Sequence, residues 1–234
     1  MKDDFRFTPI VKCVGFNCNL RCGYCFYHDS TREQKQMSLP TTEVLIKETC
    51  LHNRNGTANF VWHGGEPLLA GIDFFREIIN LQKKYTDNSQ PVINGIQTNG
   101  VLVNECWLDF FKENSFRIGV SLDGPQKFHD YYRRYPNGKG SFRDVMKSVE
   151  LFKKHNFPFG VVSVITDISV KYPDRVFEFF LENEIHCVKF SRSIYKDECG
   201  RMQKGTTNPE EYGKFLLRIM DLWLAEDNPE IKFA

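Results

Sequence analysis

The chain has 234 residues, of which 41% are hydrophobic and 26% charged, so it is long enough to bury one large core or two modest ones. Its 31 basic and 30 acidic side chains give a net charge of +1, without blocks of like charge. We therefore expect neither nucleic acid nor an anionic membrane surface as a partner. The sequence contains no apolar run of about 18 residues and no leader pattern, which predicts a cytoplasmic protein without a membrane span.

Short runs of β-branched and aromatic residues alternate with amphipathic segments along most of the chain. The predicted strands cover residues 8–14, 58–63, 91–98, 116–122, 157–165 and 186–192. The predicted helices cover residues 42–53, 73–85, 104–114, 141–155, 172–184 and 208–225. A further strand begins after the last helix, and we expect that the chain is truncated there. We expect two parts, a domain over residues 1–205 and a C-terminal extension over residues 206–234.

This alternation predicts an α/β fold with parallel strands joined by right-handed crossovers. Six such units can form an open doubly wound sheet or a barrel that is incompletely closed. Hydrophobic periodicity does not distinguish the two.

Three of the eight cysteines, Cys18, Cys22 and Cys25, follow the first predicted strand within eight residues, in CNLRCGYC. Thiols stay reduced in the cytoplasm, so a metal site is favoured over disulfides. A structural zinc site needs four ligands, and His28 or His63 is the nearest candidate for the fourth. A 4Fe-4S cluster held by three thiolates leaves one iron open to a ligand. The alternative that the three thiols are ordinary packing residues of the core suits them poorly, because polar residues and glycine flank them.

The CxxxCxxC spacing, with Tyr24 before the last cysteine, resembles the signature of the radical S-adenosylmethionine (SAM) family. Four more segments are similar, in the same order, to anaerobic sulfatase-maturating enzymes and related peptide maturases with SPASM domains: WHGGEPLL from Trp62, QTNG from Gln97, SLDGP from Ser121 and HDYYR from His129. The similarity extends from Val11 to Ala225. It implies a partial (β/α)6 barrel of the radical SAM type followed by a C-terminal helix.

The resemblance also implies a reaction. A 4Fe-4S cluster on the three cysteines would bind SAM through its open iron, and one electron would cleave SAM to methionine and a 5'-deoxyadenosyl radical. The radical would abstract hydrogen from a peptide or protein substrate. A flavodoxin or ferredoxin would supply the electron. A closed site that fixes SAM and excludes water suits such a species.

The resemblance implies a set of SAM contacts as well. Gly64 and Gly65 would leave the backbone open to a ligand, and Glu66 would accept hydrogen bonds from the SAM ammonium. Ser121 and Arg133 would hold the ribose and the carboxylate, with Arg134 as an alternative to Arg133. Tyr24 would lie near the adenine. Ile194 would contact the adenine or fill the core.

Several polar residues and cysteines have an equally simple structural interpretation. Gln97, Thr98 and Asn99 shape the pocket or form a turn. For Asp123 and His129 the alternatives are a turn-forming aspartate and a hydrogen-bonded surface histidine, or a direct role in catalysis. Burial is expected for four cysteines, Cys13, Cys50, Cys106 and Cys187. Cys199, in a polar loop, could be reactive or bind an auxiliary cluster.

Two features depart from the sulfatase maturases. The cysteines of a SPASM domain are absent, and the segment VKFSRSIYKDECGR from Val188 lacks the expected pattern. The sequence therefore favours an enzyme that crosslinks a ribosomally made peptide. The alternatives are a sulfatase maturase that makes formylglycine and a non-catalytic zinc-binding scaffold.

Overall fold

A computed structural model of the protein describes residues 6–25, 35–87, 89–197, 199–226, 228 and 230–233. Seven strands form one sheet in which every neighbouring pair is parallel and the spatial order follows the chain order. The strands are β1 (Ile10–Lys12), β2 (Ala58–His63), β3 (Val92–Thr98), β4 (Arg117–Ser121), β5 (Phe159–Ile165), β6 (Cys187–Arg192) and β7 (Lys232–Phe233).

Helices connect these strands. The α-helices are α1 (Leu39–His52), α2 (Ile72–Tyr85), α3 (Glu105–Glu113), α4 (Gln126–Tyr132), α5 (Phe142–Lys154), α6 (Pro173–Glu182) and α7 (Pro209–Glu226). Two short 3-10 helices cover Pro67–Ala70 and Ser169–Lys171. Polar caps start several helices, because the first backbone N–H groups lack partners within the helix. The side chain of Ser38 accepts from Thr41 N, and that of Asn104 from Trp107 N.

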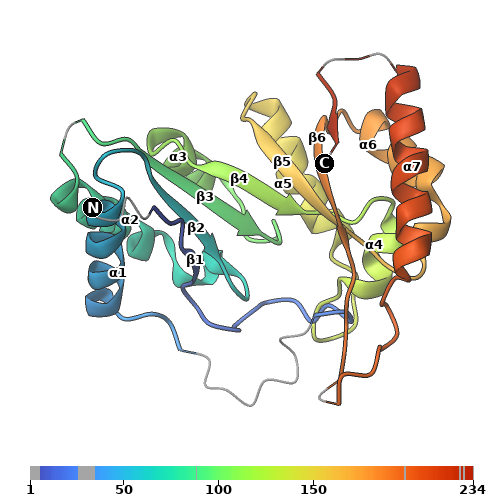
Figure 1. Cartoon of the computed structure of the whole chain (residues 1–234), viewed down its shortest axis with the longest axis horizontal. Helices are drawn as coiled ribbons and strands as arrows, with labels where there is room; N and C mark the ends of the chain where they lie inside the picture. The colour runs from blue at the N-terminus through green and yellow to red at the C-terminus, as the bar shows by residue number, and fades with distance from the viewer. Residues whose placement is uncertain are drawn as a thin grey trace, which may run out of the picture.

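The strand order selects between the two predicted architectures. A doubly wound sheet reverses its strand order at a switch point, whereas here each crossover moves one strand further in the same direction. The sheet is curved, and α1, α2, α3, α5, α6 and α7 lie along its outer side (Figure 1). The predicted partial barrel with a C-terminal helix is confirmed.

Alternation along the strands separates a helix-facing side from a concave side. Phe60 and Trp62 of β2 are buried and stack on each other, and Trp62 meets Phe75 of α2 in a T-shaped, edge-to-face contact at 5.9 Å between ring centroids. The residues that alternate with them in β2, such as Val61 and His63, are only partly buried. The main core therefore lies between sheet and helices, which leaves the concave side for a site.

Most predicted elements are present, with shorter strands. The helix α4 was not predicted, because seven residues with three aromatic side chains carry little helical periodicity; Pro125 precedes it, and Pro125 O accepts from Phe128 N. The predicted last strand is β7, which pairs with β6. Phe215 and Ile219 of α7 belong to the main buried core. The boundary predicted after residue 205 stays a prediction.

None of the helices within the described residues combines the length and the apolar character that crossing a membrane requires.

A buried polar cluster joins β2, β3 and α2. The side-chain oxygen of Asn94 accepts from Trp62 Nε1 at 2.9 Å and from Gln82 Nε2 at 2.8 Å, and Asn94 Nδ2 donates to Gln82 Oε1 at 2.9 Å. All three side chains are almost fully buried. Such groups need their partners, because water cannot replace them.

Replacement of Asn94 by alanine should therefore lower the free energy of unfolding by about 2–4 kcal/mol, since it leaves the Trp62 and Gln82 groups unpaired. Urea unfolding followed by tryptophan fluorescence measures this. Asn80→Ala, on the exposed face of α2, is the control and should cost less than about 1 kcal/mol. Equal losses in the two variants would contradict the role of the cluster.

Candidate active site

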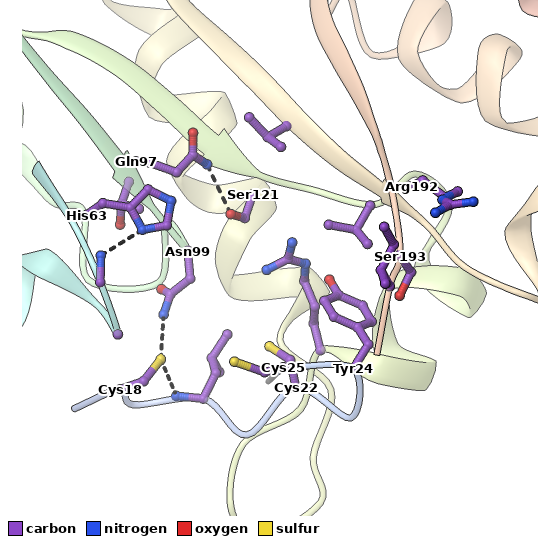
Figure 2. Close-up of a pocket in the computed structure, with 18 residues that line it drawn as sticks. Cys18, Cys22, Tyr24, Cys25, His63, Gln97, Asn99, Ser121, Arg192 and Ser193 are labelled. Atoms are coloured by element: carbon purple, nitrogen blue, oxygen red, sulfur yellow. Dashed lines mark hydrogen bonds between the residues drawn. The ribbon is translucent and has the colours of Figure 1, made fainter. Parts of the chain in front are cut away.

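A cavity of about 420 Å³ lies at the carboxyl ends of the strands, on the concave side of the sheet (Figure 2). Parallel α/β folds place their ligands at this edge. The residues that line the cavity come from the cysteine loop, from the carboxyl-end parts of β2 to β6 and the residues after them, and from the end of α4: Cys18, Leu20, Cys22, Tyr24, Cys25, His63, Gly64, Gly65, Gln97, Thr98, Asn99, Ser121, Arg133, Val162, Val164, Arg192, Ser193 and Ile194.

The loop after β1 brings all three clustered cysteines to this cavity. Figure 2 shows their sulfur atoms on the same side of the loop. The Leu20 N–H donates to Cys18 Sγ at 3.4 Å, and Asn99 Nδ2 donates to it at 3.7 Å. Burial raises the pKa of Cys18 to about 11 and that of Cys22 to about 12. The two thiols therefore stay protonated by themselves, and a cationic metal group would release their protons as it binds.

The zinc alternative needs a fourth ligand. His28 lies outside the described residues. His63 lines the cavity, and its Nδ1 accepts the Gly64 N–H at 2.7 Å. Burial and the charge of Lys12 lower the pKa of His63, so the ring is neutral with its proton on Nε2. Within the described residues, no three His, Cys, Asp or Glu side chains are grouped as ligands of a single ion.

A buried ion pair stands beside the cysteine loop. Arg133 Nε donates to Asp123 Oδ2 at 2.9 Å, and the two side chains are 8% and 2% exposed. Tyr24 donates its hydroxyl to the same oxygen at 2.6 Å, while Asp123 Oδ1 accepts from Val164 N at 2.9 Å. The Arg133 guanidinium also lies 5.5 Å from the centre of the Tyr24 ring. One carboxylate thus positions a tyrosine and an arginine on the cavity wall.

The structure separates the two neighbouring arginines. Arg133 lines the cavity, and its Nε donates to Asp123, while the terminal nitrogens of its fork form no hydrogen bond with another residue in the described part of the chain. Arg134 is exposed, and its Nε donates to Asp130 O. Ser121 also lines the cavity and accepts from Gln97 Nε2 at 3.1 Å, which leaves its own proton for an acceptor.

Glu66 is fully buried, and the residues that line the cavity do not include it. Its Oε1 accepts from Leu68 N at 3.0 Å and from Thr98 Oγ1 at 2.7 Å, and its Oε2 accepts from Asn99 N at 2.7 Å. Burial raises its pKa to about 7. The carboxylate thus joins the ends of β2 and β3. Its predicted contact with the SAM ammonium stays a prediction.

Gly64 and Gly65 line the cavity, but their lack of side chains serves the protein's own backbone. A Cβ on Gly65 would lie 1.8 Å from Asn17 O, and one on Gly64, whose φ is +94°, would lie 2.8 Å from Gly15 O. Gly65 N donates to Gly15 O at 2.9 Å. The two glycines therefore let the segment before the first cysteine lie directly on the end of β2.

The other residues for which the sequence left a pocket role open are Gln97, Thr98, Asn99 and Ile194. Gln97, Thr98 and Asn99 all line the cavity, as the pocket alternative required. Ile194 lines the cavity and is 48% exposed, which rules out a core position. The roles of these residues toward a ligand stay predictions.

The sequence overestimated the burial of two cysteines. Cys13 and Cys50 are buried as predicted, but Cys106 and Cys187 are exposed. Cys106 is on the outer side of α3, next to the buried Trp107, and Cys187 is the first residue of β6. Hydrophobic character alone does not decide which side of an element a cysteine occupies. Cys199 is exposed as well.

His129 contacts the backbone of Asp123, which belongs to the buried ion pair with Arg133. It is fully buried and does not lie at the surface. Its Nδ1 accepts from Asp123 N at 3.4 Å, and its Nε2 lies 3.0 Å from Ser141 Oγ. Burial lowers its pKa to about 4, with Asp123 and Asp130 acting to raise it and Arg133 to lower it. The imidazole is therefore neutral in the folded protein.

The lowered pKa of His129 makes the free energy of unfolding depend on pH. Between an ordinary pKa near 6.5 and the folded value near 4, the unfolded chain binds the proton and the folded one does not, so acid favours unfolding in this window. From about pH 7.5 to about pH 5, wild type should lose about 2 kcal/mol more unfolding free energy than His129→Gln. Urea titrations at the two pH values measure it. The exposed control His52→Gln should behave as wild type, and parallel losses in wild type and His129→Gln would contradict the assignment.

Comparison with known proteins identifies the family of this chain. The model of the radical SAM superfamily matches residues 13–180. The chain is 35% identical over 225 residues to the cysteine-type anaerobic sulfatase-maturating enzyme of Clostridium novyi, covering 94% of this chain and 60% of the relative. It is 36% identical over 238 residues to the serine-type enzyme of Bacteroides thetaiotaomicron, covering 93% and 57%. The chain thus spans less than two thirds of these relatives.

Solved structures show the same likeness. Native anSMEcpe with bound AdoMet and the Kp18Cys peptide superposes with a TM-score of 0.87 at 31% identity, covering 97% of this chain and 63% of that chain. Streptococcus suis SuiB with bound S-adenosylmethionine shares the fold, with a TM-score of 0.74 at 16% identity, covering 99% and 50%. With its cysteine loop at the mouth of a partial barrel, the chain belongs to the radical SAM superfamily, whose members use a 4Fe-4S cluster and S-adenosylmethionine.

Proposed function

We propose that this chain is the radical SAM part of an enzyme that abstracts hydrogen from a peptide or protein and so modifies it after translation. The observation that carries the proposal is the convergence of Cys18, Cys22 and Cys25 with Ser121 and Arg133 on one cavity. The donor set fits the group: three thiols for the cluster, which leave one iron for SAM. The similarity to sulfatase-maturating enzymes supports a peptide substrate.

When bound, the cluster supplies one electron that breaks a C–S bond of SAM and yields the 5'-deoxyadenosyl radical. The chain's own residues would hold SAM for that step. The free nitrogens of Arg133 present a planar fork that suits a carboxylate, and the Ser121 hydroxyl can donate to a ribose oxygen. Tyr24, fixed by Asp123, would lie along the adenine.

The rest of the wall would protect the radical. Leu20, Val162 and Val164 line the cavity with hydrophobic side chains. These side chains would exclude water from the radical. Their own C–H groups must stay out of reach of the radical carbon, so SAM has to be held in one pose. Several contacts from different strands serve that purpose.

Two modifications are candidates. Formylglycine formation from a Cys or Ser of a sulfatase is supported by the relatives at 35% and 36% identity, one a cysteine-type and one a serine-type enzyme. Crosslinking of a ribosomally made peptide is favoured by the sequence expectation alone, since the segment from Val188 to Arg201 lacks the pattern that we expect of sulfatase maturases. The likeness to SuiB, at 16% identity, concerns the fold alone.

The cysteine assignment predicts a specific loss. After anaerobic reconstitution with iron and sulfide, wild type should bind a cluster, and with SAM and dithionite it should release 5'-deoxyadenosine. Cys22→Ala should lose both the iron–sulfur absorbance and the product, because a thiolate ligand is missing. The exposed Cys106→Ala should keep both. Stoichiometric zinc without sulfide in the purified protein, together with no SAM cleavage, would favour the scaffold alternative.

The substrate class can be tested with two peptides. The intact enzyme, incubated with SAM and a sulfatase-derived peptide carrying Cys or Ser at the modified position, should produce an aldehyde that captures a hydrazide probe. A peptide with Ala there is the control. A crosslinking enzyme would leave the sulfatase peptide unchanged and would produce a hydrazide-silent bridge in a precursor peptide, found by tandem mass spectrometry. Failure with both peptides while 5'-deoxyadenosine still forms would remove both candidates.

A further inference from the structure

The helix α7 carries apolar side chains on two opposite sides. On one side, Phe215 and Ile219 are buried in the main core. On the other side, Leu217 is 60% exposed, Met220 47% and Leu224 64%. Figure 1 shows α7 on the outer side of the sheet, at the edge of the molecule. A helix that packs on one core needs only one apolar side, so the second side is left without a partner among the described residues.

The apolar residues on this second side follow the spacing of a coiled-coil seam. Gly213, Leu217, Met220 and Leu224 are successively four, three and four residues apart. Side chains at this alternating spacing lie on one side of a helix and pack against a second helix laid beside it. We name these four residues the outer stripe.

Gly213 is an unfavourable residue for its position, since glycine destabilises the interior of a helix relative to alanine. A Cβ at Gly213 would meet no described atom within 4 Å outside its own helix. The packing of the chain on itself therefore does not require a glycine there. The space over Gly213 is open to a side chain from another molecule.

Two opposite charges flank the outer stripe on the same side. Lys214 and Asp221 each directly follow a residue of the stripe. Lys214 pairs with Glu210 at 2.9 Å, but both side chains are exposed, and such a pair contributes little. Asp221 forms no ion pair with another described residue. Arg218, the cation nearest to it along the helix, is paired with Asp174 of α6 at 2.7 Å.

We propose that α7 is a dimerisation surface, against which a second copy of this chain packs its own α7 in the antiparallel direction. A twofold symmetric dimer uses the same patch of both copies. In an antiparallel pair centred on the outer stripe, Leu224 of each copy enters the open space over Gly213 of the other. Lys214 of each copy then lies opposite Asp221 of the other. Symmetry forms this ion pair twice, and this complementarity of the surface with itself selects a second copy as the occupant.

A parallel pair of α7 helices fits the same residues poorly. It would place Gly213 against Gly213 of the second copy and leave a hole between them. It would also bring Asp221 opposite the apolar Leu216 of the second copy, and would leave Lys214 without an acidic partner across the interface. The positions of the glycine and of the two charges therefore favour the antiparallel direction.

The proposed interface leaves the active-site cavity of each copy accessible. The helix α7 is on the outer side of the sheet, whereas the cavity is on its concave side (Figure 1). The inference concerns the surface of the folded chain, so it depends neither on the proposed function nor on a bound cluster. Because one pair of helices forms a small interface, we expect a dimer that dissociates in the micromolar range.

Sedimentation equilibrium of the 234-residue chain over a range of concentrations measures the dissociation constant. Reductant is present throughout, because exposed cysteines could otherwise link two copies. The double variant Leu217→Gln/Leu224→Gln should dimerise about tenfold more weakly than wild type, because polar groups replace apolar contacts. The matched control Val44→Gln/Leu51→Gln changes two exposed apolar residues of α1 and should dimerise as wild type.

An exchange of the two charges tests the direction of the helices. Lys214→Glu alone and Asp221→Lys alone each place like charges opposite each other twice per dimer, and each should weaken dimerisation about tenfold. The combined variant Lys214→Glu/Asp221→Lys has opposite charges across the interface again and should dimerise as wild type. A parallel dimer, in which the two positions do not meet, would show no such recovery.

Three results would overturn the proposal. The first is wild type that stays monomeric throughout the micromolar range, which would leave the outer stripe to another occupant or to solvent. The second is an equal dissociation constant for the outer-stripe variant and the α1 control. The third is a combined charge variant that dimerises as weakly as the two single ones. Circular dichroism checks that each variant is folded; if the glutamine variant were not, the charge exchange, which changes only exposed side chains, would decide.

Discussion

The buried ion pair between Asp123 and Arg133 is the interaction on which the site depends. Removing both charges from water is costly, and the cost is offset only when each group is fully satisfied. Asp123 achieves this with Arg133, the Tyr24 hydroxyl and the Val164 N–H. Those partners come from the end of α4, the cysteine loop and β5. A single carboxylate after β4 therefore sets the relative positions of three segments that are distant in sequence.

A second set of contacts fixes the cysteine loop from the opposite side. Gly65 N donates to Gly15 O and Glu66 N to Asn17 O, and only glycine fits at position 65 because a Cβ would meet Asn17 O. The Glu66 carboxylate then ties this turn to Thr98 and the Asn99 backbone. The loop contains no helix or strand within residues 13–25, so these contacts, with the Asp123 cluster, replace secondary structure in holding the thiols. A cluster site made this way is preorganised without being part of the sheet.

The same loop separates two chemical surroundings. Its inner side faces a cavity with hydrophobic walls, where a radical needs to be kept from water. Its outer side presents the exposed Arg21 beside the exposed Arg134. The cavity lies on the concave side of the curved sheet, at the carboxyl ends of the strands (Figure 1).

Much of the fold and the site was predictable because the deciding signals are local. Strand and helix periodicity predicted β1 to β6 and all the long helices, and the spacing of Cys18, Cys22 and Cys25 is itself a ligand pattern. Periodicity left open whether the sheet was doubly wound, because strand order is a property of long-range pairing. The exposed positions of Cys106 and Cys187 were missed for the same reason: burial depends on what packs against an element.

Sequence by itself determined most of the helices and strands and the close spacing of Cys18, Cys22 and Cys25, since covalent spacing and alternation are properties of the chain itself. Only the tertiary structure decided that Asp123 binds Tyr24 and Arg133, that Arg133 rather than Arg134 faces the cavity, and that Gly65 makes room for Asn17. Each of these depends on atoms from segments far apart in sequence meeting within hydrogen-bond or van der Waals distance, and no local pattern encodes that distance.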